Sequence, residues 1–336
     1  MPSQPAVPPL LAPYVTSLPH SSLTVLSSVL DATGNWLVLR FLYAALSASS
    51  HSHIAFGSDG VDGRKKRKVV LGLDLARLTD KGEFAFVDGL SELFYAPSAT
   101  QRSPAPSSSP SAIPPRTVLP LRTSPGAVPG RALHPLPRPT STVPSTASAE
   151  SGRTKRLHFS GSGSGALDAL EHDIANVIEQ LKTSKAGDEG EPEVLLVIDQ
   201  PDMLLAATGP NKGIGATEMG EWVMGLQEHA CATILTLSAD SPLIHNASTS
   251  ASQSATPLEM EHAAFAIGSA HRAEMVMQLR SLETGAARDV SGVLRISKGG
   301  AWGRGEKTGA EGDWEEKEVL YFIQRDGGVR IFGRGE

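Results

Sequence analysis

The chain has 336 residues, of which 40% are hydrophobic and 20% charged, and its formal net charge is -6. This length allows one large domain or two ordinary ones, and the negative charge argues against binding nucleic acid by bulk electrostatics. The single cysteine, Cys231, excludes a disulfide within the chain and is typical of a reducing compartment.

The sequence predicts no membrane segment and no secretory signal. The longest apolar helical stretch, residues 36–48, is too short to span a bilayer and is interrupted by Arg40. The N-terminal residues lack the basic region followed by an apolar region that a secretory signal has. We therefore expect a soluble intracellular protein with no membrane partner, in which the glycosylation sequon at Asn246 is idle.

The front of the chain predicts a strand, a turn and a helix after a proline-rich N-terminal arm at residues 1–20. Residues 22–30 read as the strand, and residues 36–48 have the apolar spacing of a helix. A phosphate-binding P-loop lies at this position in many α/β domains and needs the pattern G-x-x-x-x-G-K-[ST]. The turn between the two elements has one glycine, Gly34, with no lysine and no serine or threonine that opens the helix. We predict a degenerate P-loop.

A run of basic residues follows the first helix. It is typical of a solvated loop, and the absence of interleaved aromatic residues favours that interpretation. Contact with RNA phosphates, or recognition as a nuclear-import signal, stays open. The residues are Arg64, Lys65, Lys66, Arg67 and Lys68.

The composition then divides the chain into parts. Residues 82–90 predict a strand that ends on Asp88, within a first part of the domain at residues 21–96. Residues 97–154 hold more than half of the chain's 24 prolines, together with many serines. Such a segment buries too little apolar surface to fold, so we predict a disordered insertion. The remainder of the domain is expected at residues 155–336.

The second part begins with a short strand at residues 157–159 and a glycine run at residues 161–165. The glycine run resembles a dinucleotide-binding loop, but the strand before it is weak and no ribose-binding acid follows a second strand. Ser164 is more simply interpreted as the N-cap of a helix. One face of that helix carries the apolar residues Leu167, Leu170, Ile174, Val177, Ile178 and Leu181.

Residues 194–198 form an unbroken apolar run that ends on Asp199. Such a run predicts a strand covered on both faces, as in the middle of a parallel sheet. A carboxylate directly after a buried strand is also how P-loop NTPases hold magnesium. Asp199 is therefore the Walker-like acid of the chain, and the strand is expected to be central.

The remaining elements complete an α/β pattern. A helix at residues 217–230 follows the loop 208–216, and the loop 239–257 follows a buried strand. The glycine-rich residues 300–308 come close to a phosphate loop, but they lie between two strands and contain an intruding Glu306. The predicted strands are residues 232–237, 275–279, 290–296, 319–323 and 329–332, the last of them antiparallel.

Five segments of the chain carry a family likeness: GLDLARL at 72–78, FAFVDGLSELF at 84–94, LLVIDQPDMLLA at 195–206, SGVLRISKGG at 291–300 and EVLYFIQRDGGVRIFGRGE at 318–336. In order and spacing these segments resemble the subunit 6 family of the Elongator complex, in its fungal form. We therefore expect an α/β fold with a RecA-like core: a mainly parallel central sheet, antiparallel C-terminal strands and a degenerate P-loop. The likeness covers most of residues 20–96 and 155–336. The sequence departs from the family at residues 51–68, where a further strand and helix would be expected.

The resemblance implies a non-catalytic subunit that joins Elongator subunits 4 and 5 in a six-membered ring. That ring binds tRNA and supports wobble-uridine modification by the catalytic Elongator subcomplex, in the cytoplasm and nucleus. We expect no catalytic residue, no cofactor and no metal ligand. In RecA-like rings the loops after the central strands face the opening, so Lys212, His245 and Asn246 are candidate tRNA contacts. An active NTPase or kinase with an unconventional phosphate loop, and a scaffold without RNA contact, stay open as alternatives.

Overall fold

The computed structural model describes residues 7–16, 18–51, 75–95, 154–184, 193–244, 255–282, 287–303 and 314–333. The chain separates into two units, and all described residues belong to the one made of residues 1–95 and 152–336. The predicted insertion at 97–154 lies outside the described residues, apart from Thr154.

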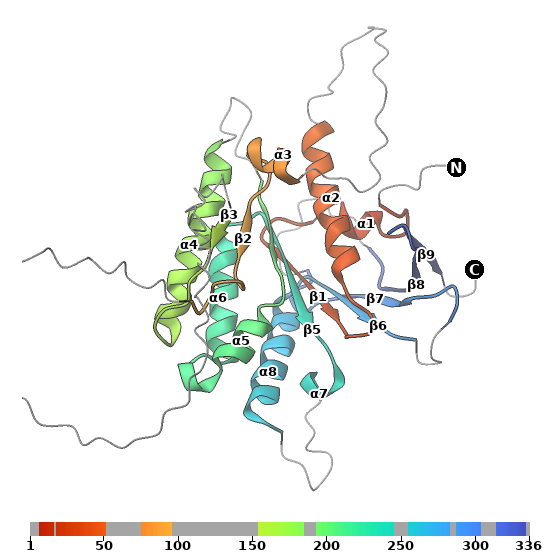
Figure 1. Ribbon diagram of the computed structural model, residues 1–336. Coiled ribbons are helices and arrows are strands. Elements are labelled where there is room, and N and C mark those ends of the chain that lie inside the picture. The colour runs from red at the N-terminus through yellow and green to blue at the C-terminus, as the bar shows by residue number, and fades with distance from the viewer. Residues whose placement is uncertain are drawn as a thin grey trace, which may run out of the picture. The chain divides into compact units, whose positions relative to one another are not determined.

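A seven-stranded sheet forms the centre of this unit, in the order β4-β5-β1-β6-β7-β8-β9 (Figure 1). The first four strands in that order pair in parallel, and β7, β8 and β9 continue the sheet in antiparallel pairs. The prediction of an α/β fold with a mainly parallel central sheet and antiparallel C-terminal strands is therefore confirmed. The strands are β1 (Ser22–Ser28), β4 (Leu195–Ile198), β5 (Ala232–Ser238), β6 (Met275–Arg280), β7 (Gly292–Lys298), β8 (Lys317–Ile323) and β9 (Val329–Gly333).

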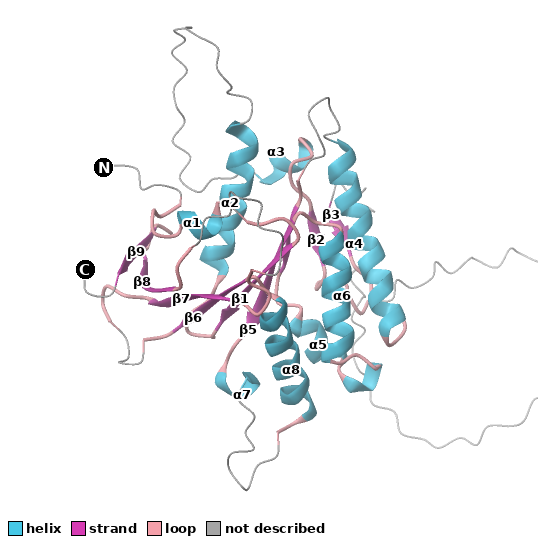
Figure 2. Cartoon of the chain, turned by 180° about the vertical axis from the view of Figure 1, so that it is seen from behind, coloured by secondary structure: helices cyan, strands magenta, loops and turns pink. Residues whose placement is uncertain are grey.

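Helices cover both faces of the parallel strands (Figure 2). One face carries α1 (Ala12–Val15) and α2 (Asn35–His51). The other carries α4 (Ser164–Ser184), α5 (Asp202–Thr208), α6 (Ala216–Glu228) and α8 (Pro257–Arg272). Two further short helices are α3 (Leu75–Asp80) and α7 (Ser241–Ile244).

The alternation of side chains along the strands explains the two helix layers. In β1, Leu23 and Val25 belong to the core beneath α4 and α6, whereas Leu26 belongs to the core beneath α2. Successive side chains of a strand point to opposite faces, so a strand such as β1, whose first five residues are all buried, needs a helix layer on each side. The two cores together bury most of the large apolar residues of the strands.

The amphipathic stripe predicted for residues 164–184 is confirmed in α4. Five of its six members are buried, and Leu181 is half-buried. Their spacing of three and four residues places them on one face, which packs into the same core as α6. Lys182, in the last turn of the helix, is half-buried and pairs with Glu179.

The prediction that residues 194–198 form the middle of the sheet is wrong. The strand forms, as β4, but it is the edge strand and pairs only with β5. Its first three residues are half-buried, whereas six of the seven residues of β5 are buried. The apolar run arises because both faces of β4 pack on neighbouring elements, not because strands flank it on both sides.

The proline-rich N-terminal segment also differs from the arm that we predicted. Leu11, Tyr14 and Val15 are buried in the core beneath α2. The Tyr14 ring lies 5.4 Å from that of Trp314, and its hydroxyl donates to the Glu315 carbonyl oxygen at 2.8 Å. These apolar residues recur every three or four positions, which lets a short helical turn bury all of them.

A second, two-stranded sheet joins β2 (Phe86–Asp88) to β3 (Thr154–Arg156) in parallel. The strand that we predicted at 157–159 therefore lies three residues earlier. Leu157 is buried, and its amide donates to the Asp88 carbonyl oxygen at 2.9 Å, so pairing runs slightly beyond the end of the strand. The prediction that the preceding strand ends on Asp88 is confirmed.

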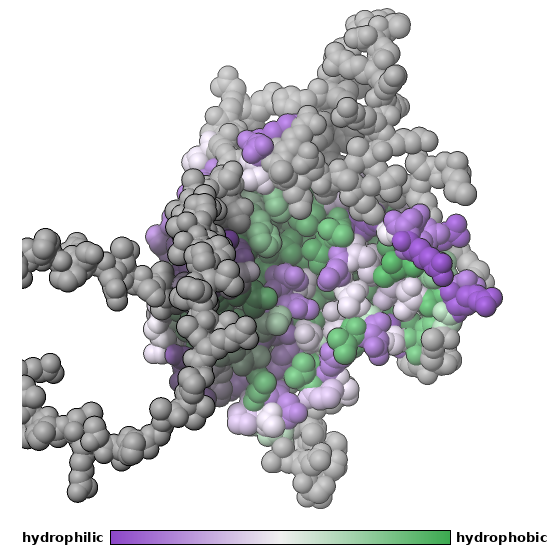
Figure 3. Space-filling view, viewed as in Figure 1, coloured by the Kyte–Doolittle hydropathy of each residue, from purple (hydrophilic) through white to green (hydrophobic). Residues whose placement is uncertain are grey.

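Polar and apolar side chains both reach the surface, with apolar ones gathered toward the middle of the face shown in Figure 3. Among the described residues, no helix is both long and apolar enough to cross a membrane.

Candidate functional site

The carboxyl ends of β1, β4 and β5 meet at one edge of the sheet, which we call the carboxyl edge. Residues 199–202 follow β4, residues 239–240 follow β5, and residues 29–34 follow β1. Ligands of open α/β sheets bind at such an edge, because the loops there are free to vary while the strands stay fixed. The edge therefore carries the predicted Walker-like residues Gly34 and Asp199.

Asp199 is held by the neighbouring strand. The Thr236 hydroxyl donates to Asp199 Oδ1 at 2.6 Å, and the amide of Gln200 donates to Thr236 Oγ1 at 2.8 Å. Because Ile198 is in register with Leu235, Thr236 lies level with Asp199. Gln200 has a φ of 49°, a left-handed conformation that turns the chain from β4 toward α5. The exposed Asp199 carboxylate thus fixes this turn.

Hydrogen bonds within the protein hold the turn between β1 and α2 in a closed conformation. The amide of Ala32 donates to the Val29 carbonyl oxygen at 2.9 Å, and the amide of Leu30 donates to Asp240 Oδ1 at 3.1 Å. A phosphate loop needs its backbone amides free to bind phosphate oxygens. Here two amides of the turn are used within the protein, and one of them holds a carboxylate, which repels phosphate.

Gly34 has a packing role in this turn. It is buried, and a Cβ atom there would lie 2.3 Å from Leu26 Cδ2 and 3.6 Å from Leu279 Cδ1. Glycine lets the start of α2 approach β1 closely.

Beneath the carboxyl edge lies a buried pair of ionisable side chains that the sequence did not reveal. Asp202, at the start of α5, and His262, in α8, have side chains that are 5% and 4% exposed. His262 Nε2 lies 3.3 Å from Asp202 Oδ2, and Nδ1 lies 3.2 Å from the Leu243 carbonyl oxygen. Both neighbours are acceptors, so both contacts become hydrogen bonds only when both ring nitrogens carry a proton. The pair ties α5, α7 and α8 together.

The pKa of Asp202 reflects two opposing effects. Burial raises it, but hydrogen bonds from His262 and Ser238 outweigh burial and hold the pKa below its ordinary value of 3.8. The Ser238 amide lies 3.3 Å from Asp202 Oδ2, at the end of β5. Asp202 Oδ1 is buried and has no hydrogen-bond partner among the described residues. The ionised carboxylate is therefore a structural charge under the edge.

Lys212 lies in a short 3-10 helix, η1 (Pro210–Lys212), with its side chain exposed. Its carbonyl oxygen accepts from the Gly163 amide at 2.6 Å. A Cβ at Gly213 would lie 3.7 Å from the Gly163 Cα. The glycine run before α4 therefore allows two loops to approach, and it leaves the Lys212 ammonium facing solvent.

The other predicted contacts cannot be placed. His245, Asn246 and the basic run at 64–68 lie outside the described residues.

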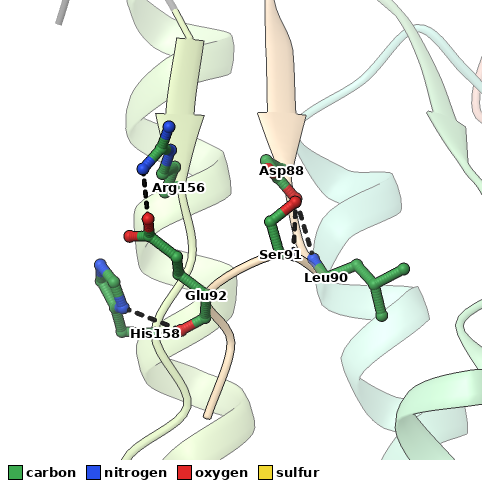
Figure 4. A network of polar contacts seen from close by, with 6 residues as sticks. All are labelled: Asp88, Leu90, Ser91, Glu92, Arg156 and His158. Carbon is green, nitrogen blue, oxygen red and sulfur yellow. Dashed lines mark hydrogen bonds and ion pairs between the residues drawn. The ribbon is translucent and has the colours of Figure 1, made fainter. Parts of the chain in front are cut away.

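The end of β2 carries a further polar network, shown in Figure 4. Asp88 Oδ1 accepts from the amides of Leu90 and Ser91 at 3.1 and 3.0 Å. The Ser91 amide, with smaller contributions from the Ser91 hydroxyl and the Leu90 amide, lowers the pKa of Asp88. Arg156 forms an ion pair with Glu92, and His158 Nδ1 lies 3.2 Å from the Glu92 carbonyl oxygen. These contacts close the turn after β2 against β3.

Comparison with models of protein families found no match, and comparison with curated proteins found none either. The site is therefore interpreted from its geometry. Its acidic residues Asp199, Asp202 and Asp240 all contact protein groups, and the turn after β1, residues 29–34, contains no lysine.

Proposed function

We propose that this chain is a non-catalytic RecA-like subunit of the Elongator complex. In this role it assembles with Elongator subunits 4 and 5 into a hetero-hexameric ring, which binds tRNA and supports wobble-uridine modification by the catalytic subcomplex. The family resemblance of the sequence motivates the proposal, and the sheet order, in which β5 separates β1 from β4, is compatible with a RecA-like fold.

One observation carries the non-catalytic part of the proposal. The turn after β1 uses the Leu30 amide to hold Asp240, and Asp199 is tied to Thr236. A phosphate loop would instead present amides and a lysine, which neutralise the phosphates of a nucleotide. We infer that the carboxyl edge derives from a nucleotide site whose polar groups now stabilise the fold.

An exposed apolar stripe on α8 supports assembly with neighbouring subunits. Met260 and Ile267 are 50% and 49% exposed, and their spacing of seven residues places them two turns apart on one face of the helix. A shallow hollow beside them is lined in part by Ile244 and Ala263. Contiguous apolar surface of this kind is typical of an interaction site, because a neighbour that covers it removes it from water.

The experiment that tests this function uses the chain expressed together with subunits 4 and 5. We expect a stable complex whose mass corresponds to two copies of each subunit. In that complex, Lys212→Glu is expected to weaken tRNA binding several-fold, because the exposed ammonium no longer meets a phosphate. The slope of log K against log salt should also fall by about 0.7–0.9 for the lost contact.

Lys317→Glu is the matched control, because Lys317 is exposed on β8, among the antiparallel strands. It should leave tRNA affinity unchanged. If the Lys212→Glu and wild-type complexes bind tRNA with equal affinity, Lys212 is not part of the RNA interface. That result would favour the alternative of a scaffold without RNA contact. Failure of the three chains to assemble would contradict membership of the ring.

A further inference from the structure

The opposite end of the parallel strands, which we call the amino edge, brings three potential metal ligands together. His20 lies just before β1, Glu193 just before β4, and Cys231 directly before β5. These three strands are neighbours and run in parallel, so the residues that precede them meet at one place. Their wide separation in the sequence hides the cluster from any spacing pattern.

The side chains are within reach of one ion. The Cys231 Sγ lies 3.2 Å from His20 Nδ1, and His20 Nε2 lies 3.3 Å from Glu193 Oε1. One ligand atom from each residue lies within 4.8 Å of those of the other two. Ligand distances of about 2.0–2.3 Å around Zn²⁺ place neighbouring ligand atoms about 3.3–3.8 Å apart. A contraction of at most about 1.5 Å between ligand atoms therefore completes the geometry.

The backbone holds these residues in position while two of the side chains stay free to adjust. The Ser21 amide donates to the Cys231 carbonyl oxygen at 2.6 Å, and the Cys231 amide donates to the Val194 carbonyl oxygen at 2.9 Å. The imidazole of His20 and the carboxylate of Glu193 are 74% and 70% exposed. Both can rotate toward a common ion without disturbing the core.

We propose that His20, Glu193 and Cys231 form a three-ligand Zn²⁺ site at the amino edge, with its fourth position open to water or to a group of a partner. The ligand set selects this class of ion. A thiolate and an imidazole favour borderline-soft zinc, whereas Mg²⁺ and Ca²⁺ prefer shells made of oxygen atoms. The site does not depend on the ring function, because it lies at the opposite end of the strands from the carboxyl edge.

The test is titration of the full, reduced chain with Co²⁺, a spectroscopic substitute for Zn²⁺. We expect a thiolate-to-cobalt absorption band that saturates at about one ion per chain and disappears when Zn²⁺ is added. The chain has one cysteine, so such a band reports Cys231 directly. Cys231→Ser should abolish it, and His20→Ala and Glu193→Gln should each weaken Co²⁺ affinity about tenfold or more.

His172→Ala is the matched control, because His172 is exposed on α4 and should leave Co²⁺ affinity unchanged. Circular dichroism checks that each variant is folded. Absence of the band in the wild-type chain would overturn the proposal. Wild-type affinity in both His20→Ala and Glu193→Gln would overturn it as well, since the thiol would then bind the ion alone.

Discussion

Replacing His262 with alanine is expected to lower the free energy of unfolding by about 3–5 kcal/mol. The substitution removes the partner of Asp202 and leaves a carboxylate in a site that water does not reach. It also removes the group that contacts the Leu243 carbonyl oxygen, so α7 loses a connection to α8. Urea denaturation near neutral pH measures the loss.

A double variant separates the effect of the unpaired charge from the effect of the lost packing, and an exposed ion pair serves as the control. Adding Asp202→Asn to His262→Ala should recover part of the stability, because the unpaired charge is gone. Lys182→Ala breaks a pair with Glu179 whose side chains are 30% and 54% exposed, so it should cost about 0–1 kcal/mol. A loss below 1 kcal/mol for His262→Ala would show that the buried pair does not stabilise the fold.

The stabilisation that the buried Asp202 carboxylate provides depends on pH, because its pKa is lowered in the folded state. A carboxyl group whose pKa is lower in the folded state stabilises the fold above its unfolded pKa, near 3.8. That contribution is lost as the pH falls through the lower, folded value. The stability difference between the wild-type chain and Asp202→Asn should therefore shrink below pH 3.8, and a constant difference would contradict the assignment.

Gly299→Ala is expected to lower the free energy of unfolding by about 3 kcal/mol, at the upper end of overpacking effects. A Cβ there would lie 2.1 Å from the Ala273 carbonyl oxygen and 2.6 Å from its carbonyl carbon. Backbone atoms cannot rotate aside as a side chain can. The Gly299 amide also donates to the Glu274 carbonyl oxygen at 2.9 Å, so the end of β7 is fixed to the corner between α8 and β6.

Gly268→Ala is the matched control within α8. A Cβ at Gly268 meets no atom within 4 Å. Alanine there should stabilise the helix by about 0.5–1 kcal/mol, because glycine loses more backbone freedom on folding. Thermal denaturation of both variants compares the two glycines, and similar effects of the same sign would contradict the packing at Gly299.

Local patterns in the sequence predicted most of the elements. The apolar spacing in residues 164–184 placed α4 correctly, and the runs before Asp199 and Ser238 placed β4 and β5. These predictions succeeded because the spacing of apolar residues along an element depends only on that element's own sequence. The sequence did not predict that β4 lies at the edge of the sheet. An apolar strand that packs on both faces has the same residue pattern at the edge of a sheet and in its middle.

The contacts of the site depend on chain topology, which local patterns do not contain. Thr236 meets Asp199, and His262 meets Asp202, only because β5 and α8 pack beside β4 and α5. A helical histidine among apolar neighbours gives no signal of its partner. A buried strand that contains a threonine and ends near an acid could have suggested Thr236, but not the hydrogen bond that it makes.

Equilibrium binding of ATP with Mg²⁺ to the purified chain tests the central claim most directly. The closed turn after β1 predicts no binding at micromolar nucleotide, and no ATP hydrolysis. Micromolar affinity, together with hydrolysis that Asp199→Ala abolishes, would contradict a non-catalytic role and establish an active NTPase with an unconventional phosphate loop.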